Sequence, residues 1–164
     1  MGGLAAFGID ARVKWPNDIY VGDKKICGIL IEHSVMGMNI MHSVAGAGIN
    51  VNQRRFLSDA PNPVSMFNIR GCETDLEDVK VAVATCIEEN MGRIMEEQGR
   101  RGMHDEFMRK LWRGDGKFYP FRDAASGEVF EARIAGVEDT GMLVLEKKEG
   151  ERVGYAFKEV QFVI

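Results

Sequence analysis

The spacing of apolar residues differs between two long segments of this 164-residue chain, and the difference limits its fold class. From Leu76 to Ile94 apolar side chains follow one another at spacings of three and four, which predicts one face of a helix. Beyond Lys117 the spacing is two, as in strands that are buried on one face. We therefore expect an α+β chain in which a helical part precedes a small β-structure.

The sequence also predicts where the helices begin and end. The first helix is expected to begin with the capping-box pattern Thr74-Asp75-Leu76-Glu77, with Thr74 as its N-cap. It should continue to about Gln98, because Gly99 follows. A second, short helix is predicted over about residues 103–112, and Gly114 would end it.

Five short strands are predicted in the last part of the chain. Five strands within fifty residues, separated by turn sequences, favour a small β-barrel of the SH3-like kind. We expect one domain over residues 1–114 and this barrel over residues 115–164. The predicted strands are Lys117–Phe121, Glu128–Val137, Met142–Lys147, Arg152–Ala156 and Glu159–Val163.

Strands and tight turns are also predicted near the N-terminus. Gly22-Asp23 is a plausible hairpin turn between the runs Ile19–Val21 and Lys25–Glu32. A further strand is predicted over Asn39–Ala47, and the prolines of Asp59–Pro63 indicate a loop. Strands at such close spacing predict an antiparallel or mixed sheet.

Composition argues against several classes of function. A net charge of −4 does not favour broad nucleic-acid binding, which relies on cations that neutralise phosphates. No apolar run is long enough to predict a membrane span. The cysteines, Cys27, Cys72 and Cys86, have neither a metal-binding nor a disulfide spacing, which favours a reducing cytoplasm.

Lysines gather around the first hairpin, at Lys14, Lys24 and Lys25. Ammonium groups suit phosphate oxygens, so the cluster could form an anion site, although solvated lysines are equally compatible with it. Asp18 could serve a bound magnesium ion, which prefers carboxylates together with phosphate oxygens. The alternative for Asp18 is an ordinary turn residue.

Glycines interrupt two of the predicted strands. Gly28 lies in "ICGILIE", and Gly46, Gly48 and Asn50 lie in "GAGIN". A glycine inside a strand often marks the close approach of a ligand or of another backbone, and a β-bulge is the simpler alternative. The pattern is neither a dinucleotide fingerprint nor a phosphate-binding loop of the Walker type. Together with the lysines it describes a sheet face with room for a flat ligand.

The strings "KWPNDIY", "KKICGILIE" and "GAGINVN" occur in the order and spacing of the biotin protein ligases, the BirA-type enzymes, which this chain closely resembles. The resemblance implies part of a mixed-sheet catalytic domain followed by a small SH3-like barrel. It also implies ATP, Mg²⁺ and biotin as reactants or cofactors, and biotinyl-5′-AMP as the intermediate. The acceptor would be a lysine of a biotin carboxyl carrier protein, such as that of acetyl-CoA carboxylase. The resemblance further allows a homodimer.

The resemblance assigns roles to individual residues. Lys25 would be the active-site lysine that contacts the carboxylate of biotin and the α-phosphate. Asn17 and Asp18 would lie on the nucleotide and magnesium side, and Lys14 belongs to the same motif. The residues that would line biotin and the adenylate are Gly28, Ile29, Gly46, Gly48 and Asn50.

The chain departs from the family in one respect. It contains no Gly-Arg-Gly-Arg-Arg-Gly-Arg-type loop, which in the family precedes these motifs and closes over biotin. We therefore expect the C-terminal portion of a ligase, with weak or no activity alone and with an unpaired sheet edge that favours self-association. The alternatives are a lipoate-type ligase or transferase and a non-catalytic binding module.

Overall fold

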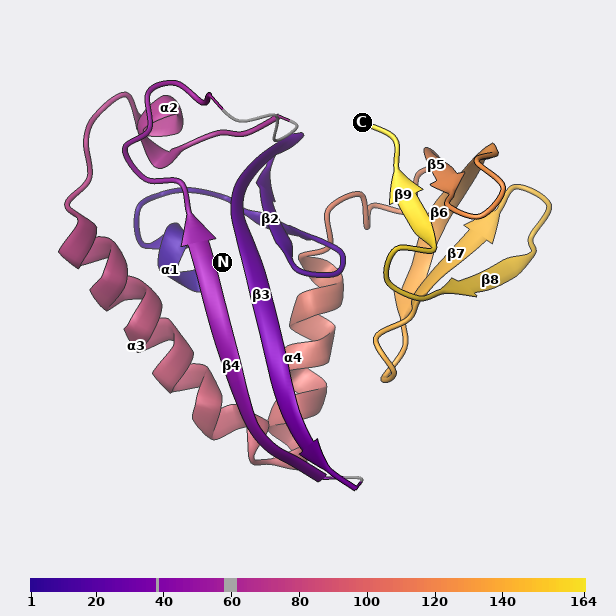
Figure 1. Ribbon diagram of the computed structural model, residues 1–164, viewed down its shortest axis with the longest axis horizontal. Helices are drawn as coiled ribbons and strands as arrows, with labels where there is room; N and C mark the ends of the chain where they lie inside the picture. Colours follow the sequence, from indigo (N-terminus) through magenta and orange to yellow (C-terminus); the bar gives the residue numbers. More distant parts are fainter. Residues whose placement is uncertain (38, 58–61) are drawn as a thin grey trace. The chain divides into compact units, whose positions relative to one another are not determined.

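The computed structural model describes residues 1–37, 39–57 and 62–164, and the chain divides into two compact units. The first unit comprises Met1–Arg12 and Asn17–Met91, and the second comprises Val13–Pro16 and Gly92–Ile164. Both contain helical residues and strands (Figure 1), which confirms the α+β class. The chain enters the second unit at Val13 and returns to the first at Asn17, within the "KWPND" string.

The sheet of the first unit is built around the predicted hairpin. β2 and β3 pair antiparallel across Gly22-Asp23, where Gly22 has a φ of +56°, a backbone conformation that glycine adopts without strain. β3 is longer than expected because it continues beyond Glu32 as a ribbon with β4 (Figure 1). The predicted loop at 59–63 lies largely outside the described residues. The strand order is β1 (Arg12–Lys14), β2 (Asp18–Val21), β3 (Lys24–Met36) and β4 (Asn39–Ile49), and Val13 and Lys14 of β1 are counted in the second unit.

The far part of the β3–β4 ribbon exposes apolar side chains. Val35 in β3 is 65% exposed and Val44 in β4 is 62% exposed. Every residue of β4 before Ile49 is exposed, so neither face of this strand is covered by other described residues. β4 is the last strand in the sheet order, and one of its edges is therefore unpaired within the described part of the chain.

Three helices accompany this sheet: α1 (Gly2–Ala5), α2 (Met66–Arg70) and α3 (Leu76–Ile94), which continues past Met91 into the second unit. The helix α2 was not predicted, since its neighbours indicated irregular structure. It begins with a capping box, in which the N–H of Asn68 donates to Ser65 Oγ (3.1 Å) and the N–H of Ser65 donates to Asn68 Oδ1 (3.2 Å).

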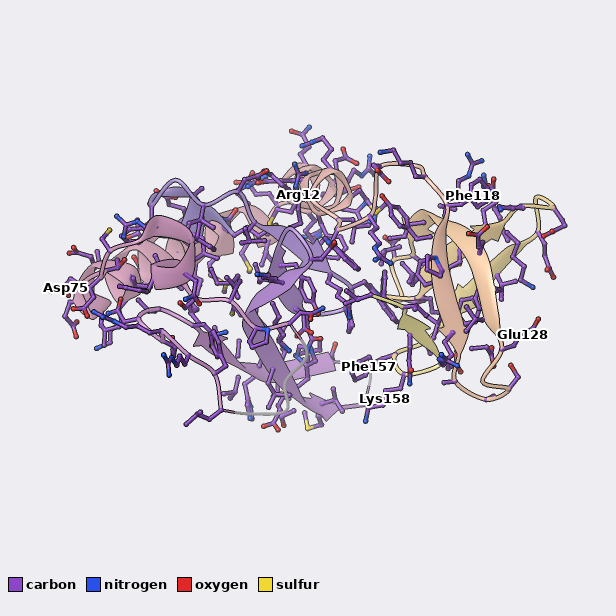
Figure 2. The ribbon with its side chains drawn as sticks, turned by 90° about the horizontal axis from the view of Figure 1, so that it is seen from above. Arg12, Asp75, Phe118, Glu128, Phe157 and Lys158 are labelled. Atoms are coloured by element: carbon purple, nitrogen blue, oxygen red, sulfur yellow. The ribbon has the colours of Figure 1, made fainter. Side chains whose placement is uncertain are left out.

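The predicted N-cap of α3 is wrong by one residue. The carboxylate of Asp75 accepts the N–H of Glu77 (2.7 Å), whereas the hydroxyl of Thr74 accepts a hydrogen bond from Arg70. Figure 2 shows Asp75 at the start of this helix. The backbone N–H and C=O of Thr74 are in addition hydrogen-bonded to the side chain of Asn52 (3.0 and 2.9 Å).

The predicted junction between the two long helices is also wrong. α3 ends at Ile94 and α4 (Glu97–Arg109) begins three residues later, so Gly99 lies inside a helix. A Cβ atom at this position would lie 2.9 Å from the carbonyl carbon of Arg93 and 3.0 Å from its Cα. Gly99 therefore permits a tight connection between two helices, and it does not stop the first one.

The second unit holds the five predicted strands in an antiparallel sheet. All five are confirmed within two residues of their predicted ends, and their order is β8-β7-β6-β5-β9. Within the described residues no pairing joins β8 to β9, so the sheet is open and a closed barrel is not seen. The strands are β5 (Tyr119–Asp123), β6 (Val129–Val137), β7 (Leu143–Lys147), β8 (Arg152–Tyr155) and β9 (Val160–Phe162).

An ion-pair network joins three neighbouring strands of this sheet. Glu146 of β7 is buried and accepts hydrogen bonds from Arg152 Nε of β8 (2.8 Å) and from Arg133 of β6. These hydrogen bonds lower the pKa of Glu146 below its ordinary value of 4.5. The core of the unit lies among Trp15, Leu111, Phe121, Ala132, Ile134, Leu143, Leu145, Tyr155 and Val160.

Candidate active site

Lys25, the lysine that the resemblance assigns to catalysis, is the second residue of β3. Its backbone N–H donates to the carbonyl of Asn62 (2.8 Å), and its carbonyl accepts the N–H of Val64 (2.9 Å). In the ladder with β2 its register partner is Tyr20. The backbone of Lys25 is therefore held between β2 and a segment that follows β4.

A register shift brings the side chain of Lys25 over Gly28. In a regular strand these two residues would point to opposite faces. The ladder with β2 shifts between Ile19 and Tyr20, so that β3 has one extra residue, Ile26, at this point. A Cβ atom on Gly28 would lie 3.2 Å from both Cε and Nζ of Lys25. The glycine thus provides the space that the lysine side chain occupies.

Asp18 completes this small polar group. Its Oδ1 lies 2.7 Å from Lys25 Nζ and 3.6 Å from the Cβ position of Gly28, which is its register partner. Both charged side chains are half-buried, with 34% of Lys25 and 24% of Asp18 exposed. An ammonium group has three donors, so Lys25 can keep its contact with Asp18 and still donate to an anion.

Asn17 anchors the start of β2 to β3. Its carbonyl accepts the N–H of Ile29 (3.0 Å), and its side-chain Nδ2 donates to the carbonyl of the same residue. This exchange positions Asp18, the next residue, opposite Gly28. No hydrogen bond to Asn17 Oδ1 is found in residues 1–37, 39–57 and 62–164, and this oxygen remains able to accept one from a ligand.

The two glycines of β4 differ in their surroundings. Gly48 is the register partner of Gly28, and a Cβ atom on it would lie 3.8 Å from the carbonyl oxygen of Gly28. Gly46 is the partner of Leu30, and nothing lies within 4 Å of its Cβ position among the described atoms. Asp18, Gly28 and Gly48 therefore form a row across three strands, and Gly46 lies two residues farther along β4.

Asn50 has a structural role that the sequence did not indicate. Its backbone N–H donates to the carbonyl of Ile26 (2.9 Å), and its Nδ2 donates to the carbonyls of Val64 (3.1 Å) and Lys25 (3.4 Å). Its amide group thus ties β4 to the strand and to the segment that hold Lys25. Asn52, from the same string, binds the backbone of Thr74 in a similar way.

Lys14 is the last residue of β1 and belongs to the second unit. Its Nζ lies 4.8 Å from the ring centroid of Phe162 in β9. The neighbouring Trp15 is buried in the core of that unit, and its Nε1 donates to the carbonyl of Gly141 (2.9 Å). In "KWPND" the first residues therefore belong to the second unit, and Asn17 and Asp18 belong to the first.

The remaining reactive groups near Lys25 are unsuited to catalysis. Burial raises the pKa of the Cys27 thiol and of the Tyr20 hydroxyl, so both stay protonated near neutral pH. All three cysteines are free thiols. The described parts of the chain hold no group of three or more His, Cys, Asp or Glu side chains that could bind a metal, so Asp18 would need oxygens from a ligand to hold magnesium. The described helices include none that could cross a membrane.

A lysine–aspartate pair above a glycine, on a strand that pairs with "GAGIN", is an arrangement that can bind an anion beside a sheet. Residues 5–50 match the model of the biotin/lipoate A/B protein ligase family, and the chain carries a domain of that family. More specifically, it is homologous to BirA and to other biotin protein ligases.

Two curated relatives and one solved structure show the extent of this similarity. The bifunctional ligase/repressor BirA of Bacillus spizizenii is 30% identical over 159 residues, which cover 93% of this chain and 46% of that protein. The biotin–[acetyl-CoA-carboxylase] ligase of Paracoccus denitrificans is 26% identical over 152 residues, which cover 86% of this chain and 59% of that protein. The crystal structure of biotin protein ligase from Aquifex aeolicus has a TM-score of 0.77 at 23% identity, covering 98% of this chain and 69% of that one. This chain spans about half the length of the curated relatives.

Proposed function

We propose that this chain provides part of the active site of a biotin protein ligase. The observation that supports this most directly is the position of Lys25 Nζ, paired with Asp18 and lying over Gly28. The Paracoccus relative is named as a ligase of acetyl-CoA carboxylase, and one structure of the Aquifex enzyme holds biotin and ATP. We accordingly propose biotin and ATP as substrates and a biotin carboxyl carrier protein as the acceptor.

The first reaction would join two anions. A carboxylate oxygen of biotin attacks the α-phosphorus of ATP, the bond from this phosphorus to the bridging oxygen breaks, and pyrophosphate leaves. The Lys25 ammonium would lie near both anions, where it lowers their repulsion and stabilises the negative charge on the α-phosphate. Its fixed backbone matters because such stabilisation depends on a donor that is already in place.

The second reaction would transfer the biotinyl group to a lysine. The neutral amine of the carrier attacks the acyl carbon of biotinyl-5′-AMP, AMP leaves, and the amine loses a proton. The acyl group is already activated, so the protein must mainly hold the two partners in position. Gly28 and Gly48 would let a flat ligand lie against the backbone, with Ile29 and Gly46 on the same strands and Asn50 directly after β4.

Magnesium would be held by Asp18 together with phosphate oxygens, and Asn17 would lie on the same side. One oxygen of Asp18 is bound by Lys25, and no partner of its other oxygen is found among the described residues. A single carboxylate is enough for magnesium when phosphates supply further ligands. The bound ion would neutralise phosphate charge.

Other features that the resemblance implies also stay proposals. They are a catalytic part over residues 1–114, an SH3-like domain over residues 115–164, a cytoplasmic location and a homodimer. The open five-stranded sheet of the second unit is compatible with the SH3-like assignment, since its strand order would need only one further pairing to close.

The test is adenylate formation in a version of the protein that is extended at its N-terminus to the length of its relatives. Labelled ATP, biotin and Mg²⁺ should give biotinyl-5′-AMP, and Lys25→Ala should lower the rate by about a hundredfold or more, as expected when a charge-stabilising donor is removed. Lys24→Ala is the matched control, because Lys24 is exposed on the same strand and should not matter. We expect weak or no activity from the 164-residue chain alone.

Three outcomes would contradict this proposal. Full activity of Lys25→Ala would remove the lysine from the mechanism. Preference for lipoate over biotin in a competition assay would identify a lipoate-type ligase or transferase. Lack of adenylate formation by the extended protein, with partner binding retained, would favour a non-catalytic binding module.

A further inference from the structure

A cavity of about 650 Å³ lies within the second unit, and no residue assigned above to biotin or ATP lines it. Its size lies in the range of sites that bind small ligands. Figure 2 shows one of its residues, Glu128, at the end of the β5–β6 pair opposite to Phe118. The lining residues are Asp123, Ser126, Glu128, Phe130, Glu131, Lys147, Lys148, Glu149 and Tyr155.

Two aromatic rings form an apolar part of the lining. Phe130 of β6 and Tyr155 of β8 are stacked, with ring centroids 6.0 Å apart and an interplanar angle of 21°. Lys147 of β7 already places its Nζ 5.8 Å from the Phe130 centroid. The ring therefore lies in surroundings where a cation is stabilised by its π-electrons, and a hydrocarbon chain could pack on the same surface.

The hydroxyl of Tyr155 has no hydrogen-bond partner among the residues that the structure describes. The residue is 8% exposed as a whole, but its hydroxyl oxygen is not among buried atoms that lack a partner, so this oxygen is accessible to solvent. Burial also raises the pKa of Tyr155, so the hydroxyl remains a donor at neutral pH. Because Tyr155 lines the cavity, this hydroxyl is available to donate to a polar group that enters.

The charges that remain available around the cavity are negative. Lys147 pairs with Glu151 (2.8 Å), and Lys148 pairs with Glu131. Glu128 and Glu149 have no ion pair or side-chain hydrogen bond with any described residue. Asp123 also lines the cavity, but its Oδ1 accepts hydrogen bonds from its own turn. Both lysines are thus paired with carboxylates of the same unit, whereas the carboxylates of Glu128 and Glu149 are not paired with a described cation.

We propose that this cavity binds a lysine or arginine side chain of a peptide segment in a partner protein. The aliphatic stem would pack on Phe130 and Tyr155, and the cationic head would pair with Glu128 and Glu149. The Tyr155 hydroxyl would donate to a backbone carbonyl of the segment. An anion would be repelled by the two carboxylates, and a bare metal ion would make no use of the aromatic surface. This docking role does not depend on the ligase function proposed above.

The test is an NMR titration of the 164-residue chain with short capped peptides that contain one central lysine. Backbone signals of Gly127 and Gly150, in the turns beside the cavity, should shift with the lysine peptide and with its arginine counterpart. The same peptide with an Nε-acetylated lysine should bind less tightly, because it has lost its charge. Equal affinity for the acetylated peptide would overturn the proposal.

Variants identify the residues responsible. Glu128→Gln and Glu149→Gln should each weaken binding by about two- to fivefold, the range of an exposed ion pair. Tyr155→Phe, which keeps the ring, should weaken it by about two- to tenfold through the lost hydrogen bond. Asp139→Asn is the matched control, since Asp139 is exposed in the same unit and does not line the cavity.

A thermal melt of each variant separates loss of binding from loss of fold. Unchanged peptide affinity in the Glu128→Gln, Glu149→Gln double variant would contradict the proposal. Saturable shifts of the same signals by Mg²⁺, without any by the lysine peptide, would do so as well.

Discussion

Lys25 and Gly28 depend on each other, because the lysine side chain fills the space that a side chain at position 28 would need. The Cε and Nζ atoms of Lys25 are both 3.2 Å from the Cβ position of the glycine, closer than most Cβ contacts in proteins. The Asp18 carboxylate is nearly as close. A methyl group at position 28 would therefore displace the ammonium group and leave its charge intact.

We expect Gly28→Ala to lower adenylate formation by about ten- to a hundredfold in the extended protein, since small displacements of a catalytic group have effects of this size. Folding should be preserved, because the flexible end of a lysine can move aside. The measurement is the initial rate with labelled ATP, together with a circular dichroism melt. Gly136→Ala is the control, since its Cβ position has no described atom within 4 Å. Equal rates for the two variants would disprove the steric argument.

The residues of this site could be found from the sequence, but not all of their roles could. Motif spacing led to Lys25, Asp18 and Gly28. Alternation alone would place the lysine and the glycine on opposite faces, because the extra residue Ile26 leaves no mark in the pattern. Asn50 was expected beside a ligand, and its side-chain amide binds backbone carbonyls, a role that the residue type does not reveal.

At the scale of elements, the junction of α3 and α4 depends on one glycine inside a helix. Gly99 lies against the backbone of Arg93, so this side of α4 approaches the end of α3 more closely than any side chain allows. A second glycine, Gly102, lies one turn later in α4, and the nearest atom to its Cβ position is Arg93 Nη2 at 3.7 Å. Substitutions at these two positions therefore test close packing and helix propensity separately.

We expect Gly99→Ala to destabilise the second unit by roughly 1–3 kcal/mol, because backbone must move to admit the methyl group. Gly102→Ala should have the opposite effect and stabilise it by up to about 1 kcal/mol, since alanine favours a helix. Chemical denaturation with tryptophan fluorescence as the signal measures both, because Trp15 and Trp112 are buried in the same unit. Stabilisation by both substitutions would show that the junction is not tight.

The elements that sequence patterns located well are those with long or regular periodicity. The five strands after residue 117 and the body of α3 belong to this class. The cap of α3 could not be decided, because Thr74 and Asp75 are adjacent and both can cap a helix. Only the hydrogen bonds with Arg70 and with Asn52, twenty-two residues away, show that Thr74 is already engaged.

At the scale of the whole chain, the first unit exposes several large apolar side chains. The β3–β4 ribbon contributes Val35, Ile40 and Val44, and α3 contributes Val81 and Ile87, all of them at least half exposed. The ribbon also ends in an edge strand without Lys, Arg, Asp, Glu or Pro, the residues that commonly prevent strands from pairing with another chain.

We therefore expect the 164-residue chain to self-associate as its concentration rises. Val44→Lys on the edge strand should shift the chain towards monomer, because a charge opposes pairing at an edge. Val129→Lys is the matched control, since this valine is 48% exposed on β6, which has a neighbour on each side. Sedimentation velocity over a range of concentrations measures the effect. A concentration-independent monomer would contradict this expectation.

The fold class followed from the change of apolar spacing, but the division of the chain into units did not. The string "KWPND" reads as one motif, yet the Trp15 side chain lies in the core of the second unit while Asp18 begins a strand of the first. Sequence spacing describes neighbours along the chain. It does not tell which of two cores a tryptophan will join.

The backbone hydrogen bonds of Lys25 have a consequence for altering this protein. Asn62 and Val64 form hydrogen bonds with the backbone N–H and C=O of Lys25, and neither of their side chains can ionise. A change of conformation in that short stretch would move the charge without touching any group that titrates. Substitutions in this stretch can therefore change the position of the Lys25 ammonium group, although a search for acids and bases would not select these residues.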